Sequence, residues 1–213
     1  MKRKICMIYT GGTIGMVPSS DGYQPKRGYF ADELRKIRDL YSEEMPQWDL
    51  IEYDPLLDSS NITYEQWNMI AGTIKENYEK YDGFVVLHGT DTMAYSASAL
   101  SFMLEGLKKP VIFTGSQIPL YELRSDGRDN LITSMMIAAN SDIHEVCLYF
   151  GNQLLRGNRA VKTSADGLIA FSSPNYPVLA KAGILIEYFP GRFLSEQKEP
   201  FRITEMKPAS IGV

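Results

Sequence analysis

The stretch GFVVLHGTDTMAYSASALSFMLEGLKKPVIFT, residues 83–114, decides the fold. It opens with a continuous apolar run, Gly83–Leu87, whose β-branched valines are typical of a strand buried on both faces. Apolar residues then recur at helical spacing, which predicts a helix over Met93–Leu104. Pro110–Thr114 is a second strand-like run. A strand, a helix and a strand in this order indicate two parallel strands joined by a crossover helix.

The same alternation continues on both sides of this stretch. Thr63 and Gln66 have the spacing of a capping box, which predicts a helix that begins there and carries an apolar face to Tyr78. Further predicted elements are strands at Lys4–Tyr9 and Glu145–Phe150 and a helix at Leu131–Ala139. The pattern predicts an α/β fold of three layers, α-β-α, with a largely parallel sheet and helices on both faces. Apolar runs at Leu168–Phe171 and Ile184–Tyr188, with glycine and proline between them, predict flanking β-hairpins.

The composition excludes several classes of protein. The 213 residues are 44% hydrophobic and 23% charged, as in soluble globular domains, and the net charge of −4 argues against a nucleic-acid partner. No stretch approaches the roughly 18 apolar residues of a membrane span, and the run Ile5–Tyr9 is too short for a signal peptide. Cys6 and Cys147 lie in apolar runs, so we expect buried thiols and a cytoplasmic protein. His88 and His144 lack the paired spacing of metal ligands, so no metal site is expected.

Polar loops follow three of the predicted strands directly. They are TGGTIG (residues 10–15), HGTDT (88–92) and TGSQIP (114–119). Ligands of parallel sheets bind beyond the carboxyl ends of the strands, so these loops are the candidate site. TGGTIG lacks both the G-x-G-x-x-G spacing and the Gly-Lys-Ser/Thr of phosphate-binding loops. It remains either a tight turn or a place where a ligand approaches the backbone while Thr13 presents its hydroxyl.

The run His88–Thr92 also has two explanations. Any one of Thr90, Asp91 and Thr92 could cap the following helix, but one cap is enough, and the run is more polar than capping requires. A histidine there could belong to a Thr–His–Asp hydrolase, although a histidine that ends a strand is more often a hydrogen-bonded core residue. Lys162 could serve a threonine nucleophile only if it is partly buried, so that it spends time neutral.

Four motifs of this sequence closely resemble those of the bacterial L-asparaginase family and occur in the same order. They are TGGTIG, HGTDTM, TGSQIP and RGNRAVK (156–162). DSSNIT (58–63) and GYQP (22–25) are similar to its remaining signatures. The resemblance covers essentially the whole chain and is greatest to the cytoplasmic type I branch. It implies hydrolysis of L-asparagine to L-aspartate and ammonia through a threonine nucleophile, without a cofactor. It also implies a homodimer or a dimer of dimers.

The resemblance implies a role for each matching residue. Thr13 is the nucleophile on the side-chain amide carbon, and Tyr23, on a mobile loop, hydrogen-bonds it. Thr90, Asp91 and Lys162 form a second catalytic set, in which the lysine acts through Thr90. The residues implied to hold the substrate are Gly12, Ser59, Ser60, Thr90, Asp91 and Ser116. Among these, Asp91 and Ser60 would face the α-amino group, Ser59 the α-carboxylate, and the Ser116 carbonyl the leaving amide.

The resemblance also implies a domain organisation. Residues 1–190 correspond to the catalytic α/β domain, and 191–213 to a linker and the start of a second domain that this sequence does not contain. In the family, the second domain of a neighbouring subunit completes each active site. The apolar helix Met93–Leu104 is consistent with a dimer interface, and the glycine-rich segment Gly11–Gly28 with a closing lid. A domain that only binds asparagine or aspartate, and an ammonia-supplying amidotransferase subunit, remain as alternatives.

Overall fold

The computed structural model describes residues 2–20 and 22–208, and its centre is one eight-stranded sheet. The strands are β1 (Lys4–Gly11), β4 (Gln47–Leu57), β5 (Gly83–Leu87), β7 (Val111–Thr114), β8 (Val146–Phe150), β9 (Gln153–Arg156), β12 (Ala180–Ala182) and β13 (Ile186–Tyr188). Their order across the sheet is β13-β12-β9-β8-β7-β5-β1-β4. The five adjacent strands β8, β7, β5, β1 and β4 run parallel to one another. The strands β9, β12 and β13 pair antiparallel. The predicted, largely parallel sheet is confirmed.

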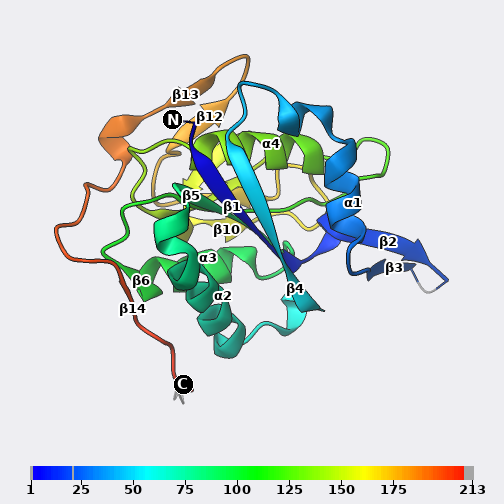
Figure 1. Ribbon diagram of the computed structural model, residues 1–213, viewed down its shortest axis with the longest axis horizontal. Helices are drawn as coiled ribbons and strands as arrows, with labels where there is room; N and C mark the ends of the chain where they lie inside the picture. The colour runs from blue at the N-terminus through cyan, green and yellow to red at the C-terminus, as the bar shows by residue number, and fades with distance from the viewer. Residues whose placement is uncertain (1, 21, 209–213) are drawn as a thin grey trace.

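Helices cover both faces of this sheet (Figure 1). They are α1 (Tyr29–Lys36), α2 (Tyr64–Asn77), α3 (Met93–Met103) and α4 (Gly127–Ala138). Because side chains alternate along a strand, β1 contributes to two cores. Ile5, Met7 and Tyr9 pack with α1 and α4, while Cys6 and Ile8 pack with α2 and α3. The three layers predicted from the alternation are therefore present.

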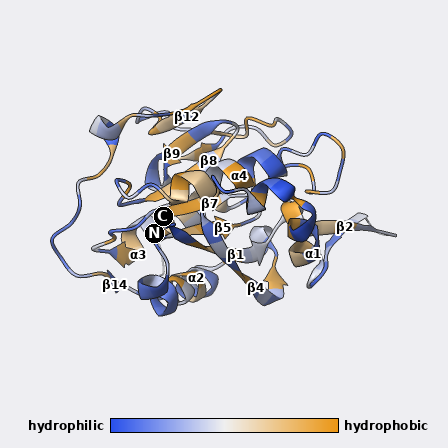
Figure 2. Cartoon of the chain, turned by 45° about the horizontal axis from the view of Figure 1, so that its top comes forward, coloured by the Kyte–Doolittle hydropathy of each residue, from blue (hydrophilic) through white to orange (hydrophobic). Residues whose placement is uncertain are grey.

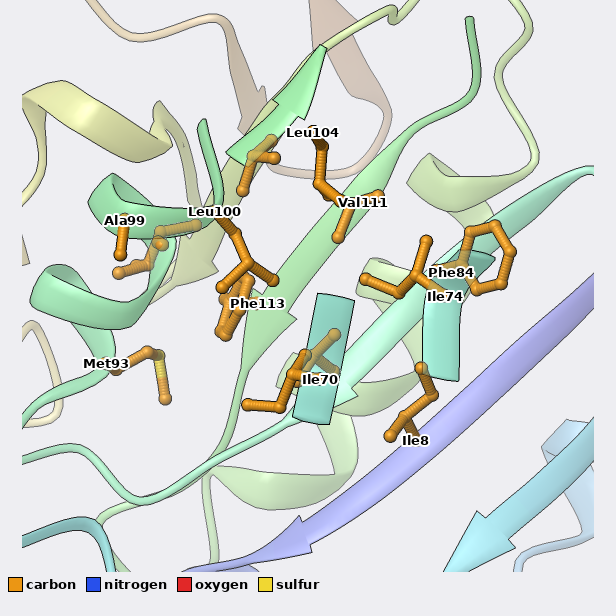
Figure 3. Close-up of a cluster of buried hydrophobic side chains, with 14 of the residues drawn as sticks. Ile8, Ile70, Ile74, Phe84, Met93, Ala99, Leu100, Leu104, Val111 and Phe113 are labelled. Atoms are coloured by element: carbon orange, nitrogen blue, oxygen red, sulfur yellow. The ribbon is translucent and has the colours of Figure 1, made fainter. Parts of the chain in front are cut away.

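The core beneath α2 and α3 explains why residues 83–114, which form β5, α3 and β7, decide the fold. Figure 3 shows Ile8 of β1 and Phe113 of β7 facing Ile70 of α2 and Leu100 of α3. Hydrophobic colouring concentrates on the central strands, such as β7 and β8 (Figure 2). Every residue of β5, β7 and β8 is buried, as the continuous apolar runs predict.

The amino-terminal cap of α2 and the burial of both cysteine thiols agree with the predictions from the sequence. Thr63 and Gln66 form the expected capping box of α2. Cys6 and Cys147 are free and buried, and burial raises the pKa of Cys6 to about 12. Among the described residues, no helix is long and apolar enough to cross a membrane.

The structure also contains elements that the apolar patterns do not indicate. The strand β4 carries charged residues and a proline, Pro55, and lies at the edge of the sheet, where a missing N–H is tolerated. The prediction also missed the strand β9 and the helix α1, although the buried Phe30 and Leu34 of α1 do have helical spacing. The expected hairpin at Ile184–Tyr188 is present as β12–β13, which extends the sheet through its pairing with β9. The second hairpin pairs β10 (Val161–Lys162) with β11 (Phe171–Ser172).

The chain reverses direction after β8. Gly151 and Asn152 form a two-residue loop with φ values of 55° and 67°, and Phe150 pairs with Gln153 across it. Two left-handed residues are the requirement of a type I′ turn, which suits the twist of adjoining strands. After β9, Gly157 lies against the Ala97 carbonyl of α3. This path returns the chain alongside α3 and places β10 near the amino end of that helix.

The residues after β13 lie on the body of the domain. The strand β14 (Arg202–Ile203) pairs with β6 (Leu104–Glu105), and the Phe201 ring stacks on Tyr78. The Met206 N–H donates to the side-chain oxygen of Asn68 at 2.8 Å. Within the segment expected to be a linker, residues 201–206 therefore run beside α2 and the end of α3. The end of this segment, 209–213, lies outside the described residues.

Candidate active site

Glycines bring three loops into contact at the carboxyl edge of the sheet. Gly12 has a φ of 93°, and a Cβ there would lie 2.5 Å from the Gly89 nitrogen. A Cβ on Gly89 would lie 2.2 Å from the Ser59 hydroxyl oxygen. Only glycine permits so close an approach, so the loops after β1, β4 and β5 pack directly against one another. This packing places Thr13, Ser59 and Thr90 around one point.

That point is a cavity of about 270 Å³. Its polar lining includes Thr13, Ser59, Thr90, Asp91, Gln117 and Lys162. Among the described residues that line it, Met16 and Leu57 supply the large apolar side chains. A space of this size suits a small polar metabolite better than a nucleotide. No cluster of histidine, cysteine, aspartate or glutamate suited to a metal ion occurs in residues 2–20 and 22–208.

Lys162 connects two residues of the HGTDT loop. Its Nζ donates to Thr90 Oγ1 at 3.1 Å and to Asp91 Oδ1 at 2.9 Å. The lysine side chain is 20% exposed, whereas that of Asp91 is 62% exposed. The lysine is thus partly buried, as a lysine that assists a threonine must be, and its charge is balanced at the mouth of the cavity.

The capping explanation for the HGTDT loop is wrong. Thr92 is the residue before α3, yet no side chain caps this helix. The Thr92 hydroxyl donates instead to the Ser59 carbonyl at 2.7 Å. The Thr90 hydroxyl donates to Gln117, and Asp91 accepts from Lys162. All three polar side chains therefore join neighbouring loops around the cavity.

His88 is a core residue, as the more common pattern predicts. Its Nδ1 donates to the Gly89 carbonyl at 2.7 Å, and its Nε2 accepts from the Ser96 hydroxyl at 2.9 Å. That hydroxyl in turn accepts from the Trp67 indole N–H. Burial lowers the pKa of His88 to about 4, so the ring is neutral at physiological pH. Its role is to hold the Gly89 backbone beside the cavity.

The hydroxyl of Tyr23 bonds Glu122, and among the described residues no hydrogen bond joins it to Thr13. It lies on β3 (Gly22–Pro25), which pairs with β2 (Met16–Ser19) in a hairpin that projects from the body (Figure 1). The Tyr23 side chain is half-exposed, and its hydroxyl donates to Glu122 Oε1 at 3.0 Å. This hydrogen bond raises the pKa of Tyr23. In this arrangement the tyrosine binds a loop residue instead of the candidate nucleophile.

Two further predicted residues lie beside the cavity but outside its lining. The Ser60 hydroxyl donates to Asp58 Oδ1 at 2.7 Å, and this bond lowers the pKa of Asp58. Ser116 is buried, and its hydroxyl donates to the Ile118 carbonyl at 2.6 Å. Gln117, which sequence reasoning did not single out, does line the cavity. The available signal was its place in the TGSQIP loop, directly after β7.

Comparison with known proteins shows the family of this chain. The family model described as "Asparaginase, N-terminal" matches residues 4–192. The chain belongs to the asparaginase family. L-asparaginase 1 of Escherichia coli K12 is 57% identical to this asparaginase-family chain over 185 residues, which are 87% of the chain and 55% of that protein.

Two further relatives extend the comparison. The crystal structure of L-asparaginase I from Vibrio cholerae has a TM-score of 0.90 and 50% identity, and the match covers 98% of this chain and 62% of that one. The 60 kDa lysophospholipase of Mus musculus is 45% identical over 203 residues, 85% of this chain and 36% of that protein. The chain spans about half the length of the bacterial relatives, and less of the mouse protein.

Proposed function

We propose that this asparaginase-family chain carries the catalytic site of an L-asparaginase, which hydrolyses L-asparagine to L-aspartate and ammonia. The observation that supports it most is the Lys162–Thr90–Asp91 array, which lines the same small polar cavity as Thr13. The catalytic unit in this proposal is residues 1–190, which the family match at 4–192 supports. The role of 191–213 as a linker into a second domain stays a prediction. The cytoplasmic location belongs to the same proposal.

The proposed reaction has two steps. Thr13 Oγ1 attacks the side-chain amide carbon and loses its proton, and the carbon–nitrogen bond breaks as the amide nitrogen takes up one proton, which releases ammonia and leaves an acyl-threonine. Water attacks this ester, and its cleavage releases aspartate and restores the hydroxyl of Thr13. In this proposal, backbone N–H groups near Gly12 and Thr90 stabilise the oxyanion that forms in each step. Lys162 acts through Thr90 on the nucleophile of each step, because its Nζ donates to the Thr90 hydroxyl and so orients the lone pair that accepts from the nucleophile, and no cofactor is required.

Charge complementarity supports the proposed orientation of the substrate. Asp91 lies at the mouth of the cavity and is exposed, so its carboxylate can bind the α-ammonium group. Ser59, on the loop after β4, also lines the cavity and is assigned to the α-carboxylate. Ser60, held by Asp58, is assigned to the α-amino side, and the Ser116 carbonyl to the leaving amide. Tyr23 is assigned to Thr13 after closure of the β2–β3 hairpin.

The lining of the cavity also separates this proposal from the activity in the mouse relative's name. A lysophospholipid has a long acyl chain, which needs an extended apolar groove, whereas this cavity is small and mostly polar. A zwitterionic amino acid is the better match. An asparagine-binding domain without turnover would require the same recognition groups but no activated threonine, and an assay distinguishes the two.

The test is ammonia release from L-asparagine by the protein and two variants. Thr13→Ala and Lys162→Ala are each expected to lower kcat by at least about 10³-fold, because one removes the nucleophile and the other its activating group. Lys181→Ala is the matched control, because this lysine is exposed on the distant β12 and should leave the rate unchanged. Unchanged rates in both site variants would refute the mechanism. Calorimetric binding of asparagine without aspartate production would favour the binding domain.

We also propose that the protein is a homodimer or a dimer of dimers. The helix α3 buries Ala97 and Leu100 in the core, but Tyr95 and Phe102, seven residues apart on its outer face, are 69% and 66% exposed. Exposed aromatic side chains on one helix face are typical of association surfaces. Sedimentation velocity at several concentrations should show a dimer or tetramer, and a monomer at every concentration would contradict it.

A further inference from the structure

Gln117 is held by hydrogen bonds at both ends of its amide. Its Nε2 donates to the carbonyls of Ala165 and Gly167 at 3.0 and 3.2 Å. Its backbone N–H is fixed by the Asp126 carboxylate at 3.1 Å. Because backbone carbonyls only accept, the NH₂ group must face them, and the amide oxygen must face Thr90. The orientation of this amide is therefore determined by its surroundings.

The amide oxygen determines the direction of the Thr90 proton. Thr90 Oγ1 lies 3.0 Å from Gln117 Oε1 and 3.1 Å from Lys162 Nζ. The ammonium of Lys162, which also binds Asp91, donates to the hydroxyl and accepts nothing from it. The single proton of Thr90 therefore points at Gln117. One lone pair of the hydroxyl accepts from Lys162, and the second is left for the cavity that Thr90 lines.

We propose that Gln117 is a positioning residue that keeps the Thr90 proton out of the cavity, so that the Thr90 hydroxyl accepts a hydrogen bond from the attacking nucleophile. This inference rests on the proposed function, in which a threonine or water O–H group is the nucleophile beside Thr90. Without an acceptor at position 117, the Thr90 proton turns toward the cavity and opposes the proton of the nucleophile. The Gln117 amide also anchors the 164–167 turn beside the cavity, through the two hydrogen bonds that its Nε2 donates.

Two substitutions separate these two tasks of Gln117. Gln117→Glu keeps an acceptor for Thr90 but loses both donors to the 164–167 turn. Gln117→Met has similar length and loses the acceptor as well as the donors. If orientation of Thr90 matters, Gln117→Met lowers kcat about ten- to hundredfold with KM within about threefold of the wild-type value, and Gln117→Glu retains the higher kcat. If Gln117 only anchors the turn, Gln117→Glu is no better than Gln117→Met, and the proposal is overturned. Gln47→Glu and Gln47→Met, on the exposed start of β4, are matched controls.

A measurement without turnover distinguishes failure of this inference from failure of the proposed function. Neutron diffraction from deuterium-exchanged crystals of the protein locates the deuteron on Thr90 Oγ1. We expect it on the line to Gln117 Oε1, and a deuteron that points to Lys162 or into the cavity overturns the inference. If the wild-type protein releases no ammonia, the proposed function fails, while the position of this deuteron still decides the role of Gln117.

Discussion

At the scale of the residue, the neutral His88 makes stability depend on pH. Its pKa in the folded chain is about 4, below the ordinary value near 6.5, because burial disfavours the charged ring. The unfolded chain therefore takes up this proton first, so the contribution to stability is complete above about pH 6.5 and is lost as pH falls toward 4. The free energy of unfolding in urea should fall by up to about 1.4 kcal/mol per pH unit in that window. His88→Gln should reduce this slope, and equal slopes in the wild-type protein and the variant would contradict the assignment.

The residue scale also shows what motifs can and cannot predict. Thr13, Thr90 and Asp91 were predictable because polar residues directly after buried parallel strands must lie at one edge of the sheet. Gln117 follows a strand in the same way, but its importance depends on backbone carbonyls about fifty residues further along the chain. No spacing rule relates a side chain to a distant backbone group, so this contact required the structure.

At the scale of the element, the β2–β3 hairpin is held to the body by the Tyr23–Glu122 hydrogen bond. Tyr23 is half-exposed and Glu122 is partly buried, so this single hydrogen bond contributes modestly to holding the hairpin, and its loss should loosen the hairpin. Tyr23→Phe and Glu122→Ala are expected to accelerate amide hydrogen exchange in Met16, Val17 and Ser19 and in Tyr23 and Gln24, with exchange in β5 unchanged. Glu43→Ala, on an exposed loop distant in sequence, is the control. Slower or identical exchange in both variants would show that this contact does not restrain the hairpin.

Whole elements were predictable where burial imposes a periodic pattern. The strand β5 was located at both of its ends because it is buried on both faces. The strand β4 was missed because an edge strand faces water along one side, so Asp49, Glu52 and Pro55 interrupt its apolar residues. The position of β4 next to β1 is set by its backbone pairing, and the sequence does not display such pairing.

At the scale of the whole molecule, a buried ion pair connects the sheet to the segment that follows it. Arg156 of β9 and Glu145 contact at 2.6 Å, and their side chains are 12% and 3% exposed. The Glu145 carboxylate also accepts from the Leu194 N–H at 2.8 Å, and Arg156 donates to the Arg192 carbonyl at 2.7 Å. The carboxylate raises the pKa of the Arg156 guanidinium, although burial opposes this effect.

Loss of the arginine should destabilise the whole domain. Arg156→Met leaves the buried Glu145 carboxylate uncompensated, which is expected to lower the free energy of unfolding by about 3–5 kcal/mol. Arg202→Met breaks an exposed pair with Glu105 and should cost less than about 1 kcal/mol. Urea titrations of both variants provide the comparison. Equal losses of unfolding free energy in the two variants would mean that burial does not increase the contribution of the Arg156–Glu145 pair to stability.

The reversal at Gly151–Asn152 has a consequence for protein synthesis. The threonines of the candidate site emerge early from the ribosome, but Lys162 belongs to the path that begins only after the turn. A nascent chain that ends at β8 can assemble the parallel strands and leave Thr90 and Asp91 without their ammonium partner. In our proposal, hydrolysis therefore cannot begin until the ribosome has passed residue 162 and β10 has paired beside α3, because only then does Thr90 gain its ammonium partner.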